Sequence, residues 1–286
     1  MTLITSIHNP RVKHVLALRE RRERERAGQM LVEGYDELAL ALACSARPVE
    51  LYHCPALMRD PAQARLLTRA QEAGAELIEV SERVFEKIAY RDGPDGWLAV
   101  FPWRRRGLAD LTLSARPLLL VAEAVEKPGN LGAMLRTADA AGVDALISCD
   151  PNTDLGNPNV VRSSKGALFS VPVAEAGSDE TIAWLRQHGI AIVAAAPGAD
   201  QDFDQINLSG PIAIAVGAEK PGLSRRWLAQ ADLQARIPMV GRVNSLNVAT
   251  SAALLVYEAV RQRRAKQRHA GQGISAAAST SQTDPA

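Results

Sequence analysis

Two apolar segments of this chain each run into the same four residues, Glu-Lys-Pro-Gly. The first copy, at 126–129, follows LLLVAEAV, and the second, at 219–222, follows PIAIAVGA. Such continuous apolar runs are typical of strands buried on both faces, as in parallel sheets covered by helices. Because Pro-Gly is also a common turn signal, the motif alone allows three interpretations: an internal repeat, two ordinary turns, or two walls of one site.

The surrounding residues favour the third interpretation. The segments after the two copies, NLGAMLRTADAAG and LSRRWLAQADLQ, do not align, which argues against duplication of a whole unit. From 117 to 265 apolar strand patterns alternate with helical ones, and this order predicts an α/β domain with a mostly parallel sheet. Since ligands in open α/β sheets bind beyond the carboxyl ends of the strands, we expect both loops to border one cleft.

A smaller α/β domain is predicted before this one, at residues 1–100, followed by a linker at 101–116 that carries a basic triplet. Within the first domain, residues 11–26 predict a short, highly charged helix. Its arginines are interpreted either as a solvated face with i,i+4 ion pairs or as a surface that faces phosphates. The chain ends in a small polar tail, 266–286, which we expect to be disordered.

Composition narrows the class of protein. Hydrophobic residues make up 47% of the 286 residues, enough for a core, and a net charge of +1 excludes a polycation. The cysteines Cys44, Cys54 and Cys149 form no Cys-x-x-Cys pair, and their odd number predicts a reducing compartment. No cluster of His and Cys suggests a metal site. The N-terminus lacks the apolar core of a signal peptide and no stretch approaches a membrane span, so we expect a soluble, cytoplasmic protein.

A third segment adds polar side chains to the predicted cleft. Residues 236–255, RIPMVGRVNSLNVATSAALL, predict an apolar strand, a glycine-bearing loop, and a helix that opens with Asn244, Ser245, Leu246 and Asn247. Asn and Ser are good N-cap residues, and capping explains one of them. It leaves Asn247, a second amide in the first turn, unexplained, which makes Asn247 a candidate site residue.

At these motifs the chain resembles a known family. In order, NLGAMLRTADAAG (130–142), AIAVGAEKPGLS (213–224) and RIPMVGRVNSLNVATSAA (236–253) are similar to the three signature motifs of the SpoU (TrmH-like) RNA 2′-O-ribose methyltransferases. The resemblance covers about 117–262. It continues more weakly into the N-terminus, which looks like the ribosomal-protein-like RNA-binding domain of many members. Ala218 stands where the family usually has Asn, and Ala141 stands where an aromatic residue is common.

The resemblance implies a fold and a cofactor that periodicity does not indicate. The fold is of the SPOUT type, in which the C-terminal stretch passes through an earlier loop and forms a deep trefoil knot. The cofactor is S-adenosylmethionine, bound bent in the knot. The positions that match its binding residues are Gly217, Ile237, Met239 and Leu246. The chain has no G-x-G-x-x-G fingerprint of a dinucleotide site.

The resemblance also implies the chemistry, methyl transfer to a ribose 2′-hydroxyl. Arg136 matches the functional arginine of the family, and a fixed cation that grips phosphate and stabilises developing alkoxide is the physically easier role for it. Asn130 is expected to contact substrate or Arg136, unless it only caps its helix. Glu219 is expected to orient Arg136 or Asn247. Ser245 and Asn247 are expected to hold the ribose and the target base.

The same resemblance indicates the partners. RNA is the expected substrate, with ribosomal RNA favoured over tRNA by the type of N-terminal domain. Arg162 is expected either to reach the cleft or to be a surface charge. We expect a homodimer through the C-terminal domain, because the last helix spreads apolar residues over more than one face. Two other classes stay open: a non-catalytic RNA-binding protein of the same fold, and a Rossmann-type oxidoreductase, against which the missing fingerprint counts.

Overall fold

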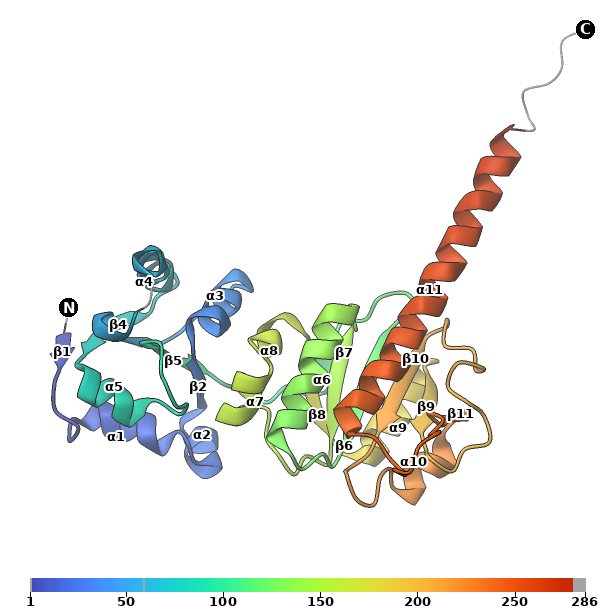
Figure 1. The fold of residues 1–286 in the computed structure, drawn as a ribbon, viewed down its shortest axis with the longest axis horizontal. Helices are drawn as coiled ribbons and strands as arrows, with labels where there is room; N and C mark the ends of the chain where they lie inside the picture. Colours follow the sequence, from blue (N-terminus) through green and yellow to red (C-terminus); the bar gives the residue numbers. More distant parts are fainter. Residues whose placement is uncertain (1, 59, 280–286) are drawn as a thin grey trace, which may run out of the picture.

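The computed structural model describes residues 2–58 and 60–279, with the backbone alone at residue 2 and over 269–279 (Figure 1). Within these residues the chain forms a five-stranded sheet, in the order β1-β4-β3-β5-β2, and a six-stranded sheet, in the order β11-β9-β10-β6-β7-β8. Figure 1 shows the two α/β bodies beside one another, with helix α11 (Val248–Ser279) extending beyond the second. They are termed the N-terminal and C-terminal domains below.

The N-terminal domain is a mixed sheet covered by helices on both faces. Helices α1 and α5 pack on one face and helices α3 and α4 on the other, so that apolar side chains of alternate strand positions enter two separate cores. The strands are β1 (Thr2–Ile4), β2 (Gln29–Glu33), β3 (Glu50–His53), β4 (Glu76–Val80) and β5 (Trp97–Pro102). The helices are α1 (Pro10–Ala17), α2 (Arg21–Ala27), α3 (Tyr35–Ala43), α4 (Arg65–Glu72) and α5 (Glu82–Ile88), with short 3-10 turns at Pro55–Leu57 and Pro61–Ala64.

The C-terminal domain has a parallel sheet, as the apolar runs predict. Its strands are β6 (Leu118–Glu123), β7 (Ala145–Cys149), β8 (Val173–Ala176), β9 (Ala191–Ala195), β10 (Ile212–Val216) and β11 (Leu233–Ala235). Helices α6 (Pro128–Ala141) and α11 pack on one face, with α7 (Pro158–Ser163) and α8 (Ala167–Ser170) against α6. Helices α9 (Ser178–Gln187) and α10 (Arg225–Gln230) pack on the other face. Both faces are therefore buried.

The two Glu-Lys-Pro-Gly loops follow neighbouring strands. Strand β10 pairs in parallel with β6, in register from Ile212 beside Leu118 to Val216 beside Ala122. All residues of both strands are buried, because each strand is covered from both faces. Neighbouring parallel strands end at the same edge of a sheet, so the two loops lie next to each other at that edge.

A buried ion pair and an aromatic pair join the domains. Arg24 of α2 lies 2.7 Å from Asp154, and the two side chains are only 2% and 8% exposed. Phe101 and Phe169 pack across the same boundary with ring centroids 5.2 Å apart. Because a buried charge that loses its partner is costly, moving one domain off the other would leave both charges unpaired at a cost in free energy.

The charged segment 11–26 forms two helices, α1 and α2, rather than the one predicted. The chain breaks between them so that Arg24 turns inward, where its guanidinium donates to the carbonyls of Leu18 and Arg19 just beyond the end of α1. Three other arginines form ion pairs, which favours the ion-pair interpretation for them: Arg11 with Glu76, Arg21 with Glu25 and Arg26 with Glu23.

Three boundaries also differ from the predicted ones. Strand β5 extends to Pro102, inside the predicted linker, where a 3-10 turn at Leu108–Asp110 also forms. Strand β11 ends at Ala235, so Ile237 and Met239 lie beyond the strand in which they were predicted; Pro238 between them has no N–H to continue the pairing. Helix α11 continues to Ser279, into the segment predicted to be a disordered tail, and 280–286 lie outside the described residues.

The structure also reports on thiols, metals and membranes. Cys54 and Cys149 are buried, Cys44 is exposed, and all three are free. Within 2–58 and 60–279, no group of His, Cys, Asp and Glu side chains is arranged to hold a metal ion. In the same ranges no helix combines the length and the apolar character needed to cross a bilayer.

Candidate functional site

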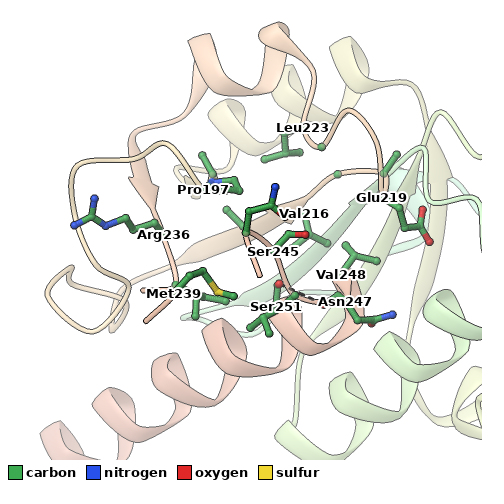
Figure 2. A pocket seen from close by; sticks show the side chains of 18 of the residues that line it. Pro197, Val216, Glu219, Leu223, Arg236, Met239, Ser245, Asn247, Val248 and Ser251 are labelled. Atoms are coloured by element: carbon green, nitrogen blue, oxygen red, sulfur yellow. Dashed lines mark hydrogen bonds between the residues drawn. The ribbon is translucent and has the colours of Figure 1, made fainter. Parts of the chain in front are cut away.

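A cavity of about 360 Å³ opens at the carboxyl ends of β9, β10 and β11 (Figure 2). It is lined by the residues that follow each of these strands and by the start of α11. Both Glu-Lys-Pro-Gly loops contribute, the first through Lys127 and the second through Glu219 and Gly222. This confirms the prediction that the two loops border one cleft, and it excludes the interpretation as two unrelated turns.

The predicted cofactor positions all line this cavity. Gly217, Ile237, Met239 and Leu246 do so, together with Ser245 and Asn247. In Figure 2 Met239, Val216, Leu223 and Val248 surround the space, so much of its wall is apolar. The arrangement suits a ligand with a flat or apolar body that is oriented by a few polar groups.

Gly217 lies where the second loop folds back against its own strand. A β-carbon at this position would lie 2.1 Å from the backbone carbon of Gly222 and 2.2 Å from the nitrogen of Leu223. Gly222 donates its N–H to the carbonyl of Ala218 at 3.0 Å, and its φ of +88° favours glycine. The loop can therefore close one wall of the cavity only with glycine at both positions.

Glu123, at the end of β6, holds the next part of this loop. The side chain is 6% exposed, and its Oε2 accepts the N–H of Ser224 at 2.7 Å. Ser224 begins helix α10, whose Trp227 donates its indole N–H to Ser178 at 2.9 Å. The carboxylate thus ties the start of α10 to the central strand β6. The sequence analysis missed Glu123, although an acidic residue inside the apolar run LLLVAEAV was a usable signal.

Three polar side chains, Asn130, Glu219 and Asn247, are joined by hydrogen bonds beside the cavity and are termed the polar chain below. Asn130 donates through Nδ2 to Glu219 Oε1 at 2.5 Å, and Asn247 donates through Nδ2 to Asn130 Oδ1 at 2.9 Å. Asn130 is 8% exposed, so its amide is held within the protein. The other oxygen of Glu219, Oε2, is buried and receives no hydrogen bond from the described residues. Such an acceptor is available to a hydroxyl or amino group of a bound molecule.

Asn247 also caps helix α11, which corrects the expectation that capping would not explain it. The helix begins at Val248, and Asn247 Oδ1 accepts the N–H groups of Ala249 at 2.9 Å and Thr250 at 3.3 Å. The amide oxygen of Asn247 therefore caps the helix, while its nitrogen donates to Asn130 beside the cavity. Ser245 and Leu246 precede it in an exposed loop, outside the helix in which they were predicted.

The two candidate arginines lie elsewhere. Arg136 is exposed on α6 and lines a separate hollow with Lys165 and with Tyr257 of α11. No hydrogen bond joins it to Asn130 or Glu219 in the part of the chain that the structure describes. Arg162 lies beside Tyr90 at the boundary between the domains rather than in the cavity.

Several lining residues were not predicted. Lys127, Arg236 and Ser251 line the cavity, as do Ala195 at the end of β9 and the next two residues, Ala196 and Pro197. The signal for the last three was present, because they are the final residues of an apolar strand pattern, IAIVAAAP, that ends at the same edge of the sheet. Finding them required the strand order, which places β9 next to β10.

The fold and the site define a class of protein. A parallel sheet covered on both faces, with a largely apolar cavity at the carboxyl ends of adjacent strands, is how α/β enzymes bind a cofactor or a small substrate. The profile of the SpoU rRNA Methylase family matches residues 117–257, and that of the MRM3-like substrate binding domain matches 9–99. The chain belongs to the SpoU rRNA methylase family.

Individual relatives agree with the family match over nearly the whole chain. The 23S rRNA (guanosine(2553)-2′-O)-methyltransferase RlmP of Bacillus subtilis is 32% identical over 257 residues, which cover 90% of this chain and 98% of the relative. A crystal structure of an RNA 2′-O ribose methyltransferase is 41% identical, with a TM-score of 0.81, over 92% of this chain and 99% of its own. An AdoMet-bound rRNA methyltransferase from Sinorhizobium meliloti is 30% identical, with a TM-score of 0.83, over 91% and 97%.

Proposed function

We propose that this chain transfers a methyl group from S-adenosylmethionine to the 2′-hydroxyl of a ribose in ribosomal RNA. The observation that carries the proposal is the free carboxylate oxygen of Glu219, fixed by Asn130 beside a largely apolar cavity. The relatives above are named as 2′-O-methyltransferases of 23S rRNA or of RNA, which supports the same substrate class here.

The cavity fits S-adenosylmethionine. A volume of about 360 Å³ lies within the range of small-ligand sites. Gly217, Ile237, Met239 and Leu246 would hold the cofactor, with much of the contact made by backbone atoms and apolar side chains. When bound, S-adenosylmethionine supplies a methyl group on a positively charged sulfur.

The polar chain prepares the hydroxyl group that is to be methylated. Asn130 occupies Glu219 Oε1, which leaves Oε2 as the acceptor for the 2′-hydroxyl proton. A hydroxyl that is hydrogen-bonded to a fixed carboxylate is held in one direction, which supplies the alignment that group transfer needs. Glu219 Oε2 then holds the proton that the hydroxyl releases. Ser245 and Asn247, on the loop before α11, would hold the ribose.

A homodimer through α6 and α11 is part of the proposal. Leu254 and Tyr257, three residues apart on α11, are 38% and 49% exposed, although large apolar side chains usually gain from burial. Tyr257 lines the same hollow as Arg136. Because Arg136 lies outside the cavity of its own chain, we propose that it acts at the cavity of the second copy, where its guanidinium holds the phosphate beside the target ribose.

The remaining parts of the proposal concern the chain path and the domains. We propose that the C-terminal stretch forms a trefoil knot; its support is that 235–251 closes one cavity with 195–197 and 216–223. We propose that residues 1–100 bind the RNA substrate, supported by the match of 9–99 to a substrate-binding domain. We propose a cytoplasmic location, supported by the bacterial rRNA methyltransferases among the relatives.

Calorimetry with S-adenosylmethionine tests the cofactor site. Gly217→Ala brings a β-carbon within 2.1 Å of the Gly222 backbone, so the wall of the cavity must move and binding is expected to weaken at least about 100-fold. Gly210→Ala is the matched control, because a β-carbon there meets no atom within 4 Å. Equal affinity of both variants and the unaltered chain would rule out this cavity as the cofactor site.

A further inference from the structure

We propose that the boundary between the two domains binds an unpaired nucleotide of the substrate RNA, with its base stacked on Tyr90 and its phosphates held by Arg19 and Arg162. The surface formed by Arg19, Tyr90, Asn159 and Arg162 is termed the seam surface. This inference rests on the proposed function, because it names the part of the protein that leads RNA toward the cavity.

Tyr90 is exposed and yet fixed at both ends. Tyr90 lies two residues beyond the end of helix α5 and is 38% exposed. Its backbone N–H donates to Glu33 of the N-terminal domain at 2.7 Å, and its hydroxyl accepts Asn159 Nδ2 of the C-terminal domain at 2.9 Å. An aromatic ring that is already immobile offers a stacking platform to a base at little further entropic cost.

Two cations flank this ring. The guanidinium of Arg19 lies 5.6 Å from the ring centroid of Tyr90. Its Nη2 donates to three carbonyls at the end of α5, of which that of Ala89 is nearest at 2.7 Å, so its other amino group is the one left for a phosphate. Arg162 lies on the other domain, exposed, and lines a small hollow with Tyr90. Among the described residues neither Arg19 nor Arg162 forms an ion pair with a carboxylate, whereas the adjacent Arg91 is paired with Asp95 at 2.5 Å. Arginines beside an exposed ring are the combination by which proteins hold single-stranded nucleic acid.

A buried acceptor opens onto the same place. Glu33 is 7% exposed and lines the hollow with Tyr90 and Arg162. Its Oε1 lies 3.7 Å from Nε of Arg91, an ion pair without a hydrogen bond, and receives no hydrogen bond from the residues described. The hollow has a volume of about 10 Å³, room for a single water, so a base would lie across its mouth rather than inside. From there an amino group on the base edge can donate toward Glu33, directly or through that water.

Helix α7 connects the seam surface to the proposed site. Ser163, next to Arg162, donates to the carbonyl of Pro128 at 3.3 Å, and a β-carbon on Gly132 would lie 1.9 Å from Ser163 Oγ. Pro128 and Gly132 flank Asn130 on α6, so α7 is packed tightly on the helix that carries the site. Figure 1 shows α1, α2 and α5 on the side of the molecule where α11 begins, and the first residues of α11 line the cavity.

Binding of transcribed 23S rRNA to four variants tests the seam surface. Tyr90→Leu removes the platform and is expected to raise the Kd about 5- to 100-fold, whereas Tyr90→Phe keeps the ring and is expected to stay within about threefold of the unaltered chain. Arg162→Ala is expected to weaken binding and to reduce the slope of log Kd against log salt by about one. Arg69→Ala is the matched control, an exposed arginine on α4, on the opposite face of the five-stranded sheet.

Each outcome decides between named alternatives. Unchanged RNA binding by Tyr90→Leu, or equal losses in Tyr90→Leu and Tyr90→Phe, would overturn the stacking role. If Arg69→Ala weakens RNA binding as much as Arg162→Ala does, the effect of Arg162 comes from overall charge and not from its place on the seam surface. Calorimetry with S-adenosylmethionine on the same variants is expected to give unchanged affinity, which shows that the cavity is intact. If the variants bind RNA normally while the unaltered chain methylates it, this inference fails and the proposed function stands; if the unaltered chain methylates no RNA, the proposed function itself fails.

Discussion

Asn130 connects the two halves of the proposed site through one side chain. Its amide donates to the carboxylate of the second Glu-Lys-Pro-Gly loop and accepts from the amide that caps α11. Both the nitrogen and the oxygen of the amide therefore have partners. The residue is only 8% exposed, which prevents water from replacing either partner. The orientation of Glu219 thus depends on a residue that itself need not touch the methyl group or the cofactor.

Asn130→Ala tests this dependence. Glu219 loses the donor that fixes it, so the rate of methyl transfer is expected to fall about 100-fold in single-turnover kinetics at saturating cofactor. The affinity for S-adenosylmethionine is expected to stay within about threefold, because Asn130 does not line the cavity. Asn207→Ala, at an exposed asparagine away from the cavity, is the matched control. A normal rate for Asn130→Ala would contradict the role given to the polar chain.

His53 predicts a specific dependence of stability on pH. It is 2% exposed, neither ring nitrogen has a hydrogen-bond partner in the described residues, and burial lowers its pKa below the ordinary 6.5. Below pH 6.5 the unfolded chain therefore takes up this proton more readily than the folded chain, so folding stability falls as the pH falls. The contribution is at most about 1.4 kcal/mol per pH unit and vanishes above that range.

Urea unfolding of His53→Gln measures this contribution. Between about pH 7 and pH 5 the free energy of unfolding is expected to fall less in the variant than in the unaltered chain, because the glutamine has no proton to gain. Glu33 and Glu175, whose pKa values are raised by burial, act in the opposite direction in both proteins and cancel in the comparison. Identical pH slopes would show that His53 is not held neutral in the folded chain.

At the scale of the elements, helix α11 carries the proposed dimer interface. Its buried side, which includes Ala252, Leu255, Val256 and Ala259, packs on the sheet, while Leu254 and Tyr257 project on another side. A second copy of the same surface would bury both side chains and would place the two α6 helices, with their Arg136 side chains, near one another.

Tyr257→Glu tests the interface. A charge at the centre of an apolar contact is expected to dissociate the dimer, so light scattering would give a mass near 30.7 kDa instead of about twice that value. Methyl transfer would fall with dissociation, since Arg136 would no longer reach the second cavity, while cofactor affinity would remain. Gln267→Glu, farther along the exposed part of α11, is the control. A monomeric unaltered chain that methylates RNA would contradict the dimer.

Individual elements show what the sequence could and could not predict. The apolar runs of β6 and β10 were sufficient to predict a parallel sheet, because few other elements tolerate so little polarity. Segment 11–26 was predicted as one helix, because the inward turn of Arg24 depends on Asp154, a residue far away in the sequence. The prediction of the polar chain had the same limitation. The motifs identified Asn130, Glu219 and Asn247 as candidate site residues, but only the fold shows which side chain contacts which.

At the scale of the whole molecule, two domains share one boundary and one proposed substrate. The buried Arg24–Asp154 pair joins them, and the seam surface uses residues from both sides of the boundary. The family profiles match the two domains separately, at 9–99 and 117–257. The proposed recognition of RNA at 1–100 and the proposed methyl transfer in the C-terminal domain would therefore act on one RNA molecule across this boundary.

Mass-spectrometric mapping of methylated nucleotides tests the central claim most directly. The purified chain is incubated with ribosomal RNA and S-adenosylmethionine, and the RNA is digested and compared with reactions of Gly217→Ala and Arg136→Ala. The proposed function predicts one methyl group on a ribose, with an unmodified base and a backbone that resists alkaline cleavage at that nucleotide, and predicts its loss in both variants. A methyl group on a base, or none at all in RNA that the unaltered chain binds together with the cofactor, would contradict the claim.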